Sequence, residues 1–595
     1  MLQVLQQPDV AADIWALKYR YDGETGVAES FARVAKAVAA AEKPELRTRW
    51  EKRFLTLMQD FAFLPAGRIL AGAGTHREVT LFNCFVMGAV ADSIEGIFDG
   101  LKQAAQTLQQ GGGIGHDFST LRPKGALVHG VGADASGPLS FMDVWDSMCK
   151  TIMSAGARRG AMMGTLRCDH PDIEDFIEAK RDPRRLRNFN LSVLVTDDFM
   201  AAVKADADWP LTFDGVVFKT LKARALWSQI MRATYDVAEP GVIFIDRINA
   251  LNPLSYCERI SCTNPCGEQP LPPYGACLLG SLNLTRFVRD AFEDGAALDM
   301  AAVQDAAGVA IRFLDNVVDV SNYPLAEQRK EAMNKRRLGL GVTGLADALF
   351  MCGLRYGSTD AVAATGQWMK AIKDAALEAS SDLAVEKGAF PLFEAQAFLE
   401  TAFGQSLAGE HRHRIRKHGL RNGLLTSIAP TGTISLVAGN VSSGIEPIFS
   451  LSYDRKILEA DGSHRVVRME DAGLRLWKAK RGKAKPPATL VTVNDLSPSE
   501  HLAMQAAAQA HVDSSISKTI NVPETLPFDE FVHVYEEAYG LGLKGCTTFR
   551  PNAVTGSILS APGHEEKSCP SCGGFDLTAR EGCTTCLTCG FAVCG

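Results

Sequence analysis

The pentapeptide Asn264-Pro265-Cys266-Gly267-Glu268 lies near the middle of the 595-residue chain and carries an amide, a thiol and a carboxylate at alternate positions. A proline biases the residue before it away from helix and toward extended backbone. In an extended segment alternate side chains share one face, whereas a helix would turn Asn264 and Cys266 apart. The stretch therefore predicts an extended segment that presents a hydrogen-bonding amide, a sulfur nucleophile or radical carrier, and a general base to one small polar molecule.

The composition around this stretch is that of an ordinary globular protein. Hydrophobic residues make up 46% and charged residues 22%, the formal net charge is −7, and the sequence pI is about 6.0. The acidic balance argues against nucleic-acid binding, and no apolar run reaches membrane-spanning length. The N-terminus lacks the basic start and apolar stretch of a signal peptide. We therefore expect a cytoplasmic protein that binds neither nucleic acid nor membrane.

Helical and strand patterns alternate along the chain. The first 60 residues are typical of helices, and apolar residues at helical spacing over 97–108 are followed by the glycine run 111–113, which ends the helix. Short β-rich runs and helical stretches then follow, the former at Leu191–Thr196, Gly241–Asp246 and Leu490–Val493 and the latter at 301–320, 360–386 and 498–512. Such alternation predicts an α/β architecture.

Three parts are expected: a helical region over 1–62, a large α/β domain over 63–560, and a linker with a Cys-rich tail over 561–595. Residues 561–567 are rich in proline, glycine and charge, which is typical of a linker. The 28 residues beyond it are too few to hold a core without a metal or a cross-link.

Six of the 15 cysteines lie in this tail. In a reducing compartment such a cluster indicates metal or redox chemistry rather than structural disulfides. Two Cys-x2-Cys pairs 14 residues apart are typical of a zinc ribbon. The natural ligand set is Cys569, Cys572, Cys586 and Cys589.

A series of segments in a fixed order resembles the large catalytic chain of ribonucleotide reductases, most closely the adenosylcobalamin-dependent class. With the opening pentapeptide they include LPAGRILAGAG (64–74), FNCFVMG (82–88), GGGIGHDFSTLRP (111–123), EPGVIFIDRIN (239–249), PTGTIS (430–435) and GLKGCTTFRPN (542–552). The resemblance runs from about residue 14 to the C-terminus. It implies a ten-stranded α/β barrel with a central finger loop, which makes 63–560 the catalytic domain with its effector-site helices.

The resemblance implies a role for each reactive residue. A thiyl radical at Cys266 would abstract the ribose 3′-hydrogen, Glu268 would take the 3′-OH proton, and Asn264 would hydrogen-bond the ribose. Cys84 and Cys277 would supply two electrons and become a disulfide. The remaining cysteines before the tail match no reactive position, and we expect them in the core: Cys149, Cys168, Cys257, Cys262, Cys352 and Cys546.

A substrate site is implied as well. The PTGTIS segment offers hydroxyls and backbone N–H groups that suit phosphate, although a plain turn would explain it equally. The residues expected to bind substrate are Asn83, Gly67, Gly112, Gly113, Pro430, Thr431, Gly432, Thr433, Ile434 and Ser435. An allosteric nucleotide site at a homodimer interface would fall on Asp92, Ser93, Ile94, Arg122, Arg158 and Arg159, where a solvated basic turn is the simpler alternative for the last two.

The source of the radical can be inferred from a departure from the family pattern. Family members that use a separate radical-generating subunit carry two adjacent tyrosines after the GLK segment, but Lys544–Arg550 contains none. The glycyl-radical signature is also missing, so we expect adenosylcobalamin. The D-x-H-x-x-G cobalamin motif is absent, so no residue that contacts cobalamin can be named from the sequence.

We therefore expect an adenosylcobalamin-dependent reductase of ribonucleotides, with diphosphates favoured over triphosphates. Its effectors would be dNTPs or ATP, and a thioredoxin- or glutaredoxin-type protein would reduce a tail dithiol, Cys589 and Cys594. If Cys589 and Cys594 form this dithiol, zinc would bind Cys569, Cys572, Cys583 and Cys586. The zinc ligand set and the dithiol assignment both stay open. The alternatives are a reductase chain that uses an external radical subunit and a zinc-ribbon nucleic-acid-binding protein with a degenerate barrel.

Overall fold

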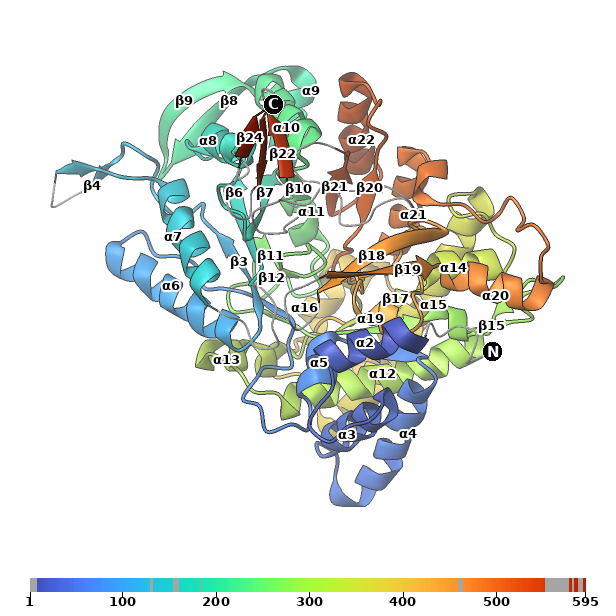
Figure 1. The fold of residues 1–595 in the computed structure, drawn as a ribbon. Helices are drawn as coiled ribbons and strands as arrows, with labels where there is room; N and C mark the ends of the chain where they lie inside the picture. Colours follow the sequence, from blue (N-terminus) through green and yellow to red (C-terminus); the bar gives the residue numbers. More distant parts are fainter. Residues whose placement is uncertain are drawn as a thin grey trace.

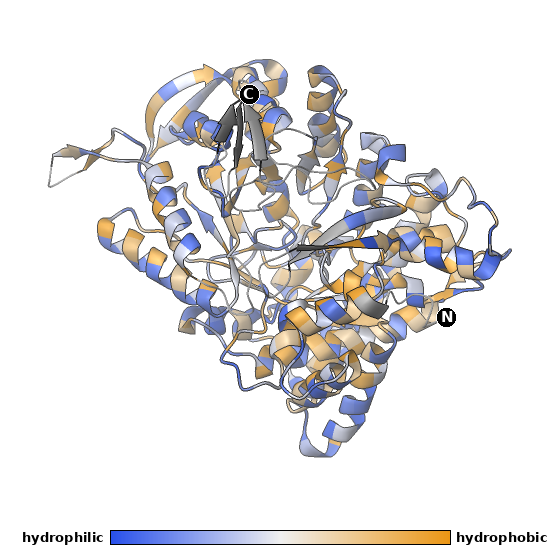
Figure 2. Cartoon of the chain, in the orientation of Figure 1, coloured by the Kyte–Doolittle hydropathy of each residue, from blue (hydrophilic) through white to orange (hydrophobic). Residues whose placement is uncertain are grey.

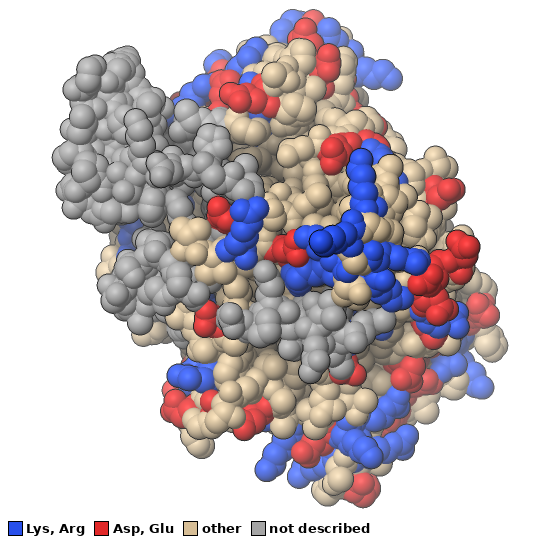
Figure 3. Space-filling view, turned by 45° about the vertical axis from the view of Figure 1, so that its right-hand side comes forward, with Lys and Arg blue, Asp and Glu red and all other residues tan. Residues whose placement is uncertain are grey.

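The computed structural model describes residues 8–128, 132–152, 160–182, 184–458 and 464–551, and the backbone of three short strands within 577–594. Figure 1 shows a helical N-terminal segment packed against a larger body of strands and helices. On the face in Figure 3, acidic and basic side chains are interspersed among broad neutral areas, apart from one group of Lys and Arg side chains. No helix in these ranges is long and apolar enough to cross a membrane.

The N-terminal segment consists of helices α2 (Pro8–Lys18), α3 (Val27–Ala39) and α4 (Arg47–Gln59). In α3 the apolar side chains recur every three or four residues and are buried. The prediction of helices in the first 60 residues is therefore confirmed. Strand β1 (Phe63–Pro65) follows and is the first strand of the chain that belongs to a sheet.

An eight-stranded sheet forms the centre of the larger body. Its strands in spatial order are β13 (Ala276–Cys277), β2 (Cys84–Val86), β3 (Gly113–Asp117), β6 (Met162–Arg167), β7 (Phe189–Val195), β10 (Gly241–Phe244), β21 (Gly545–Phe549) and β20 (Thr519–Asn521). The run from β2 to β10 is parallel. Helices α6 (Ile94–Gln109) and α7 (Pro138–Thr151) lie along its outer side in Figure 1, and α6 alternates apolar and polar residues in Figure 2, as a helix with one face on the core does.

A second sheet contains β1, β14 (Leu279–Asn283) and β17 (Gly339–Thr343). Strand β14 follows β13 after one residue, so the two sheets are continuous there along the chain. Isolated parallel bridges join Leu340 of β17 to Thr426, and Ile428 to Ile516. Ile516 lies shortly before β20 in the sequence. The predicted α/β architecture is confirmed.

Most of the predicted helices and strands are present. The three helical stretches correspond to α12 (Met300–Val320), α15 (Thr359–Lys387) and α21 (Pro498–Gln509). The runs at 191–196 and 241–246 correspond to β7 and β10, although β10 ends at Phe244 because helix α11 (Ile245–Ala250) begins there.

The strand predicted at Leu490–Val493 is wrong. Only Thr492 pairs there, in an isolated bridge with Ile448, and a short 3-10 helix begins at Val493. The reason is local, because the Asp495 carboxylate accepts hydrogen bonds from the Thr492 backbone N–H and hydroxyl at 2.8 and 2.7 Å. This capping box turns the chain where a strand would continue.

A short hairpin is inserted between the sheets. Its strands β11 (Cys262–Thr263) and β12 (Pro270–Leu271) are antiparallel. A β-carbon placed on Gly115 of β3 would lie 2.0 Å from the carbonyl oxygen of Thr263. Only glycine allows so close an approach of two backbones, and residue 115 therefore seats the hairpin, which we call the finger, against the large sheet.

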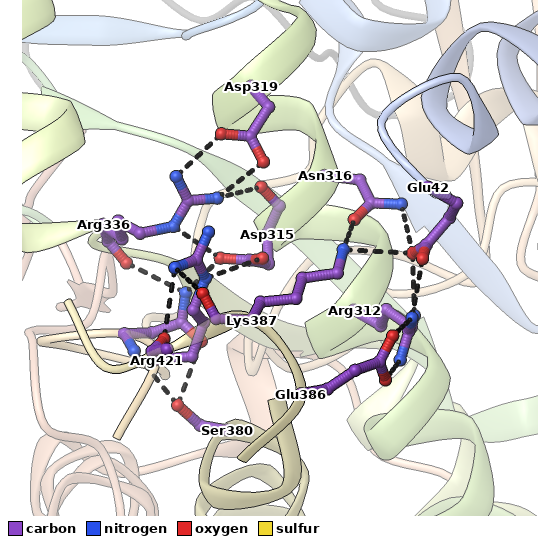
Figure 4. A network of polar contacts seen from close by, with 12 residues as sticks. Glu42, Arg312, Asp315, Asn316, Asp319, Arg336, Ser380, Glu386, Lys387 and Arg421 are labelled. Atoms are coloured by element: carbon purple, nitrogen blue, oxygen red, sulfur yellow. Dashed lines mark hydrogen bonds and ion pairs between the residues drawn. The ribbon is translucent and has the colours of Figure 1, made fainter. Parts of the chain in front are cut away.

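A buried ionic network joins the N-terminal segment to the larger body (Figure 4). Glu42, which follows α3, accepts hydrogen bonds from Arg312 and Asn316 of α12 and from Lys387 of α15, at 2.6 to 3.1 Å. Arg312 also binds Glu386 of α15. Burial alone would raise the pKa of Glu42, but Arg312, Asn316 and Lys387 outweigh it and lower the pKa to about 2. The carboxylate thus stays ionised between the helices.

We expect Arg312→Met to destabilise the protein by about 3–5 kcal/mol, because it leaves the Glu42 carboxylate buried without its main partner. Arg53→Met is the matched control, since Arg53 pairs with Asp305 on the surface, with 38% and 73% of the two side chains exposed. Its loss should cost less than about 1 kcal/mol. Denaturant unfolding of both variants is the measurement, and equal losses would contradict this account of the network.

Candidate active site

The pentapeptide Asn264–Glu268 lies at the tip of the finger, where the chain makes a tight turn. The Gly267 N–H donates to the Asn264 carbonyl at 3.0 Å, and Gly267 has a φ of +78°. The expected extended conformation is therefore wrong. The chain must reverse between β11 and β12, and proline at the second position of a turn suits that reversal.

Cys266 lies between two cavities. One has a volume of about 480 Å³ and the other about 660 Å³, and both are lined by Pro265 and Cys266. The residue is exposed, although Asn264 and Pro265 are buried and Gly267 is half-buried. One thiol can therefore meet a different molecule on each side.

Glu268 and Asn264 are buried beside this thiol. Within the described residues, neither the Glu268 Oε2 nor the Asn264 Nδ2 has a hydrogen-bond partner. Burial raises the pKa of the Glu268 carboxyl to about 7, although the Asn264 side chain acts to lower it. Buried polar groups are almost always paired, so an unpaired acceptor and donor indicate a place for a polar ligand. Of the two residues, Glu268 lines the smaller cavity.

Cys84 also lines the smaller cavity, at the start of β2. Strands β2 and β13 are antiparallel, and their register places Cys84 directly opposite Cys277. Residues so paired have Cα atoms about 4.5–5.5 Å apart, within the range a disulfide needs. Only the backbone of Cys277 is described, and it meets the requirement for the pairing that the resemblance implies.

Two glycines of the 111–113 run keep this region open. A β-carbon on Gly113 would lie 3.1 Å from the Cys84 Sγ and 3.3 Å from the Pro265 Cγ. One on Gly112 would lie 2.8 Å from the Phe85 ring. Any larger residue would push against the cysteine or the finger, which explains why glycine occupies both positions.

The PTGTIS segment forms another wall of the smaller cavity, through residues 430–434. Thr431 has a φ of +54°, and its hydroxyl lies 3.0 Å from the Thr343 hydroxyl and accepts the Gly444 N–H at 2.9 Å. Ser435 is buried with its hydroxyl 3.3 Å from that of Ser443 and does not line the cavity. The loop thus reaches the cavity before helix α19 (Ile434–Val437) buries its last hydroxyl.

Asn83 and Gly67 line the same cavity, as expected of substrate-binding positions. Sequence reasoning missed several other lining residues, among them Tyr19, Leu64, Arg68, Gly160 and Ser281. Arg68 adjoins Gly67 and is charged, so it could have been found from the sequence. The others carry no signal that separates them from ordinary core residues.

The larger cavity is lined by strand residues of β7, β10, β20 and β21 and by Phe449, Gln505 and Lys518. Its Gln505 Oε1 is buried and has no hydrogen-bond partner in the described part of the chain. Lys518 is buried and donates to Glu446 at 2.6 Å. Its lining contains no tyrosine. A mostly apolar cavity with a few polar groups is typical of a site for an organic ligand or cofactor.

The expected effector residues lie at the start of α6. The Arg122 Nε donates to Asp92 at 2.8 Å, and the Ser93 hydroxyl caps α6 by accepting the Gly96 N–H at 3.1 Å. Ile94 is 65% exposed. Asp92, Ser93 and Arg122 therefore already have structural partners, and Arg158 and Arg159 lie outside the described residues.

The prediction that the other cysteines are core residues holds for Cys149, Cys168, Cys262 and Cys546, which are buried. Cys352 is half-buried. The prediction is wrong for Cys257, which is exposed because it lies in the surface turns after α11.

The tail lies largely outside the described residues, which leaves out Cys569, Cys572 and Cys589. For Cys583 and Cys586 in β23 (Cys583–Cys586) and Cys594 in β24 (Ala592–Cys594), only the backbone is described. The two strands are antiparallel, with Cys583 opposite Cys594. The zinc and dithiol assignments stay predictions.

Comparison with known proteins identifies the family. Residues 82–549 match the family model "Ribonucleotide reductase, barrel domain", and residues 7–78 match "Ribonucleotide reductase, all-alpha domain". The chain therefore belongs to the ribonucleotide reductase family, with a helical N-terminal region followed by an α/β barrel domain.

Curated relatives indicate which class of ribonucleotide reductase this chain is similar to. The "Vitamin B12-dependent ribonucleoside-diphosphate reductase" of Mycobacterium tuberculosis (strain CDC 1551 / Oshkosh) is 40% identical over 556 residues, which cover 89% of this chain and 76% of the relative. The protein of the same name from Thermoplasma acidophilum is 37% identical, over 87% of this chain and 67% of the relative. The "Ribonucleoside-diphosphate reductase subunit alpha" of Chlamydia muridarum is 28% identical, over 69% and 44%.

We expect kcat/KM to fall tenfold per pH unit below an apparent pKa near 7, because Glu268 must be ionised to accept a proton and burial raises its pKa to about 7. Initial rates between pH 5 and 9 are the measurement. Glu268→Gln, which cannot ionise, should lose this limb together with nearly all activity. A wild-type profile that stays flat down to pH 5 would contradict the role of this carboxylate.

Proposed function

We propose that this chain reduces ribonucleotides, with diphosphates preferred, to 2′-deoxyribonucleotides by a thiyl-radical mechanism that adenosylcobalamin initiates. The observation that carries the proposal is the position of Cys266 on the shared wall of two cavities. A residue that receives a radical on one side and uses it on the other needs this arrangement.

The smaller cavity would hold the substrate. Its lining includes Cys266, Cys84 and Glu268, whose thiols and carboxyl suit the ribose. The loop 430–434 offers hydroxyls and backbone N–H groups for the phosphates. Asn264 is not among the lining residues, but its buried Nδ2 has no hydrogen-bond partner in the described residues and would donate to a ribose hydroxyl.

The reaction then follows from these side chains. The Cys266 thiyl takes the 3′-hydrogen atom, and the Glu268 carboxylate accepts the 3′-OH proton. The 2′-hydroxyl leaves as water. Cys84 and Cys277 together give two electrons and two protons and end as a disulfide, which balances the loss of water. Glu268 returns its proton to the 3′-oxygen, and Cys266 returns the hydrogen atom to C3′.

The larger cavity suits the adenosyl group of adenosylcobalamin. When bound, this cofactor supplies an organic radical that can take the hydrogen atom of a thiol. The buried Gln505 Oε1, which has no partner among the described residues, is an acceptor for an adenine amino group, and the apolar walls suit an adenosyl ring. Thr547 and Thr548 occupy the segment where a tyrosine relay would lie, and Tyr535, with its hydroxyl 3.0 Å from the Thr548 Oγ1, is not part of the cavity lining. These features favour cobalamin over an external radical subunit.

The strand arrangement supports a closed ten-stranded barrel around the finger. The two sheets are continuous at β13 and β14, and the isolated bridges of Thr426, Ile428 and Ile516 extend from β17 toward β20. With residues 1–62 as the helical region and 63–560 as the catalytic domain, the finger would thread the barrel axis. The tail, 561–595, would carry zinc and a dithiol.

The chain would act in the cytoplasm as a homodimer that dNTPs or ATP regulate. The effector residues on α6 and after β3 lie on the outer side of the sheet, where Ile94 is available to a second subunit. Cys589 and Cys594 would pass electrons from a thioredoxin- or glutaredoxin-type protein to the disulfide of Cys84 and Cys277. The acidic charge and the barrel domain argue against a nucleic-acid-binding role.

We expect purified protein with dithiothreitol and an effector to reduce cytidine diphosphate when adenosylcobalamin is added under anaerobic conditions, with no second protein. Cys266→Ser should lose at least about a thousandfold in kcat, because serine cannot carry the radical, yet bind substrate normally. Product formation by chromatography and binding by calorimetry are the measurements. Turnover that needs a second protein would overturn the choice of radical source.

A single turnover without external reductant should convert Cys84 and Cys277 to a disulfide. Mass spectrometry of alkylated peptides should show these two thiols protected, and both Cys84→Ser and Cys277→Ser should stop turnover. Cys257→Ser is the control, since Cys257 is exposed and lines neither cavity. A disulfide that involves other cysteines would contradict the assigned pair.

A further inference from the structure

Arg68 is the basic side chain of the substrate cavity. Among the residues described as lining the smaller cavity, Arg68 is the only lysine or arginine and Glu268 is the only acid. All the others are neutral. The chain thus places one positive and one negative group in a cavity that must hold a ribose and a negatively charged phosphate group.

Arg68 is held in place by its surroundings. It is the second residue of helix α5 (Gly67–Gly72) and is half-buried. A β-carbon on Gly111 would lie 2.5 Å from the Arg68 Nη1, and Gly111 has a φ of +96°. The guanidinium therefore packs directly against backbone that only glycine can form.

The glycine run gives the distance from this guanidinium to the reacting groups. At one end of the run Gly111 touches Arg68, and at the other end Gly113 lies beside the Cys84 Sγ and Pro265. Two residue steps span at most about 7 Å. The 5′-phosphates of a nucleotide lie only a few bonds from C2′ and C3′, so a ribose at Cys84 and Cys266 would bring its phosphates within reach of Arg68.

The loop 430–434, which lines the same cavity, lacks a charge. Residues 430–434 supply hydroxyls and N–H groups but no cation. A guanidinium forms paired, charge-assisted hydrogen bonds with phosphate oxygens, which are about twice as strong as neutral ones. It would also offset the repulsion between the phosphates and the Glu268 carboxylate.

We propose that Arg68 is a substrate-binding residue that pairs with the 5′-diphosphate of the ribonucleotide, together with the loop 430–434 of the same cavity. The proposal rests on the function proposed above and adds a residue that sets affinity for the charged end of the substrate. Two other uses of the side chain make different predictions: stacking on the base, and a purely structural contact with Gly111.

Arg68→Met keeps the packing stem and removes the charge, whereas Arg68→Lys keeps a charge without the paired geometry. We expect Arg68→Met to raise KM for cytidine diphosphate and adenosine diphosphate alike by about tenfold to a hundredfold. Because the contact is made equally before and during reaction, kcat should change less than about threefold. Arg68→Lys should recover part of the loss, and inorganic pyrophosphate should inhibit the wild type more strongly than Arg68→Met.

The results of these measurements distinguish phosphate binding by Arg68 from stacking on the base and from a purely structural contact. A KM for Arg68→Met within twofold of wild type, or a change confined to one base, would overturn the proposal. So would a KM that Arg68→Lys fails to improve, because that indicates a structural contact. Arg68→Gln tests the same point if the methionine variant does not fold, and effector binding serves as the check on folding. A wild type that shows no adenosylcobalamin-dependent turnover would instead defeat the proposed function itself.

Discussion

The close approach of two backbones, β3 at Gly115 and the finger at Thr263, is the constraint on which the site depends. A β-carbon at residue 115 would lie 2.0 Å from the Thr263 oxygen, so the finger is seated only because that carbon is absent. The turn at 264–267 then projects beyond the contact and leaves Cys266 between two cavities. The position of the Cys266 thiol thus depends on the packing of the finger backbone against β3.

Burial determines the protonation and the hydrogen bonding of the polar groups around this thiol. It raises the pKa of the Glu268 carboxyl to about 7, where a proton acceptor works well, and the Glu268 Oε2 and the Asn264 Nδ2 have no hydrogen-bond partner in the described residues. Arg68 and Glu268 line the same cavity, so one positive and one negative group lie near the thiol. The ionic network around Glu42 and Arg312 joins the N-terminal segment to the larger body. Tyr19 of that segment forms part of the wall of the smaller cavity.

Many of the helices and strands could be predicted from the sequence. Local patterns predicted the long helices, the strands β7 and β10 and the glycine stop after α6, because each depends on spacing within a short segment. The turn at Asn264–Gly267 could not be distinguished from a strand, since proline suits both. Cavities and the opposition of Cys84 to Cys277 arise from contacts between distant segments, for which no local pattern exists. Arg68 adjoins the predicted Gly67 and is charged, so the sequence offered a signal for it, whereas Tyr19 and Ser281 carry none.

The most direct test of the central claim is a crystal structure of the protein with cytidine diphosphate, an effector nucleotide and adenosylcobalamin. The account predicts the ribose beside Cys266, Glu268 and Cys84 in the smaller cavity, and the adenosyl group in the larger cavity on the other side of the same thiol. Both ligands on one side of the finger, or a ribose remote from Cys266, would contradict it.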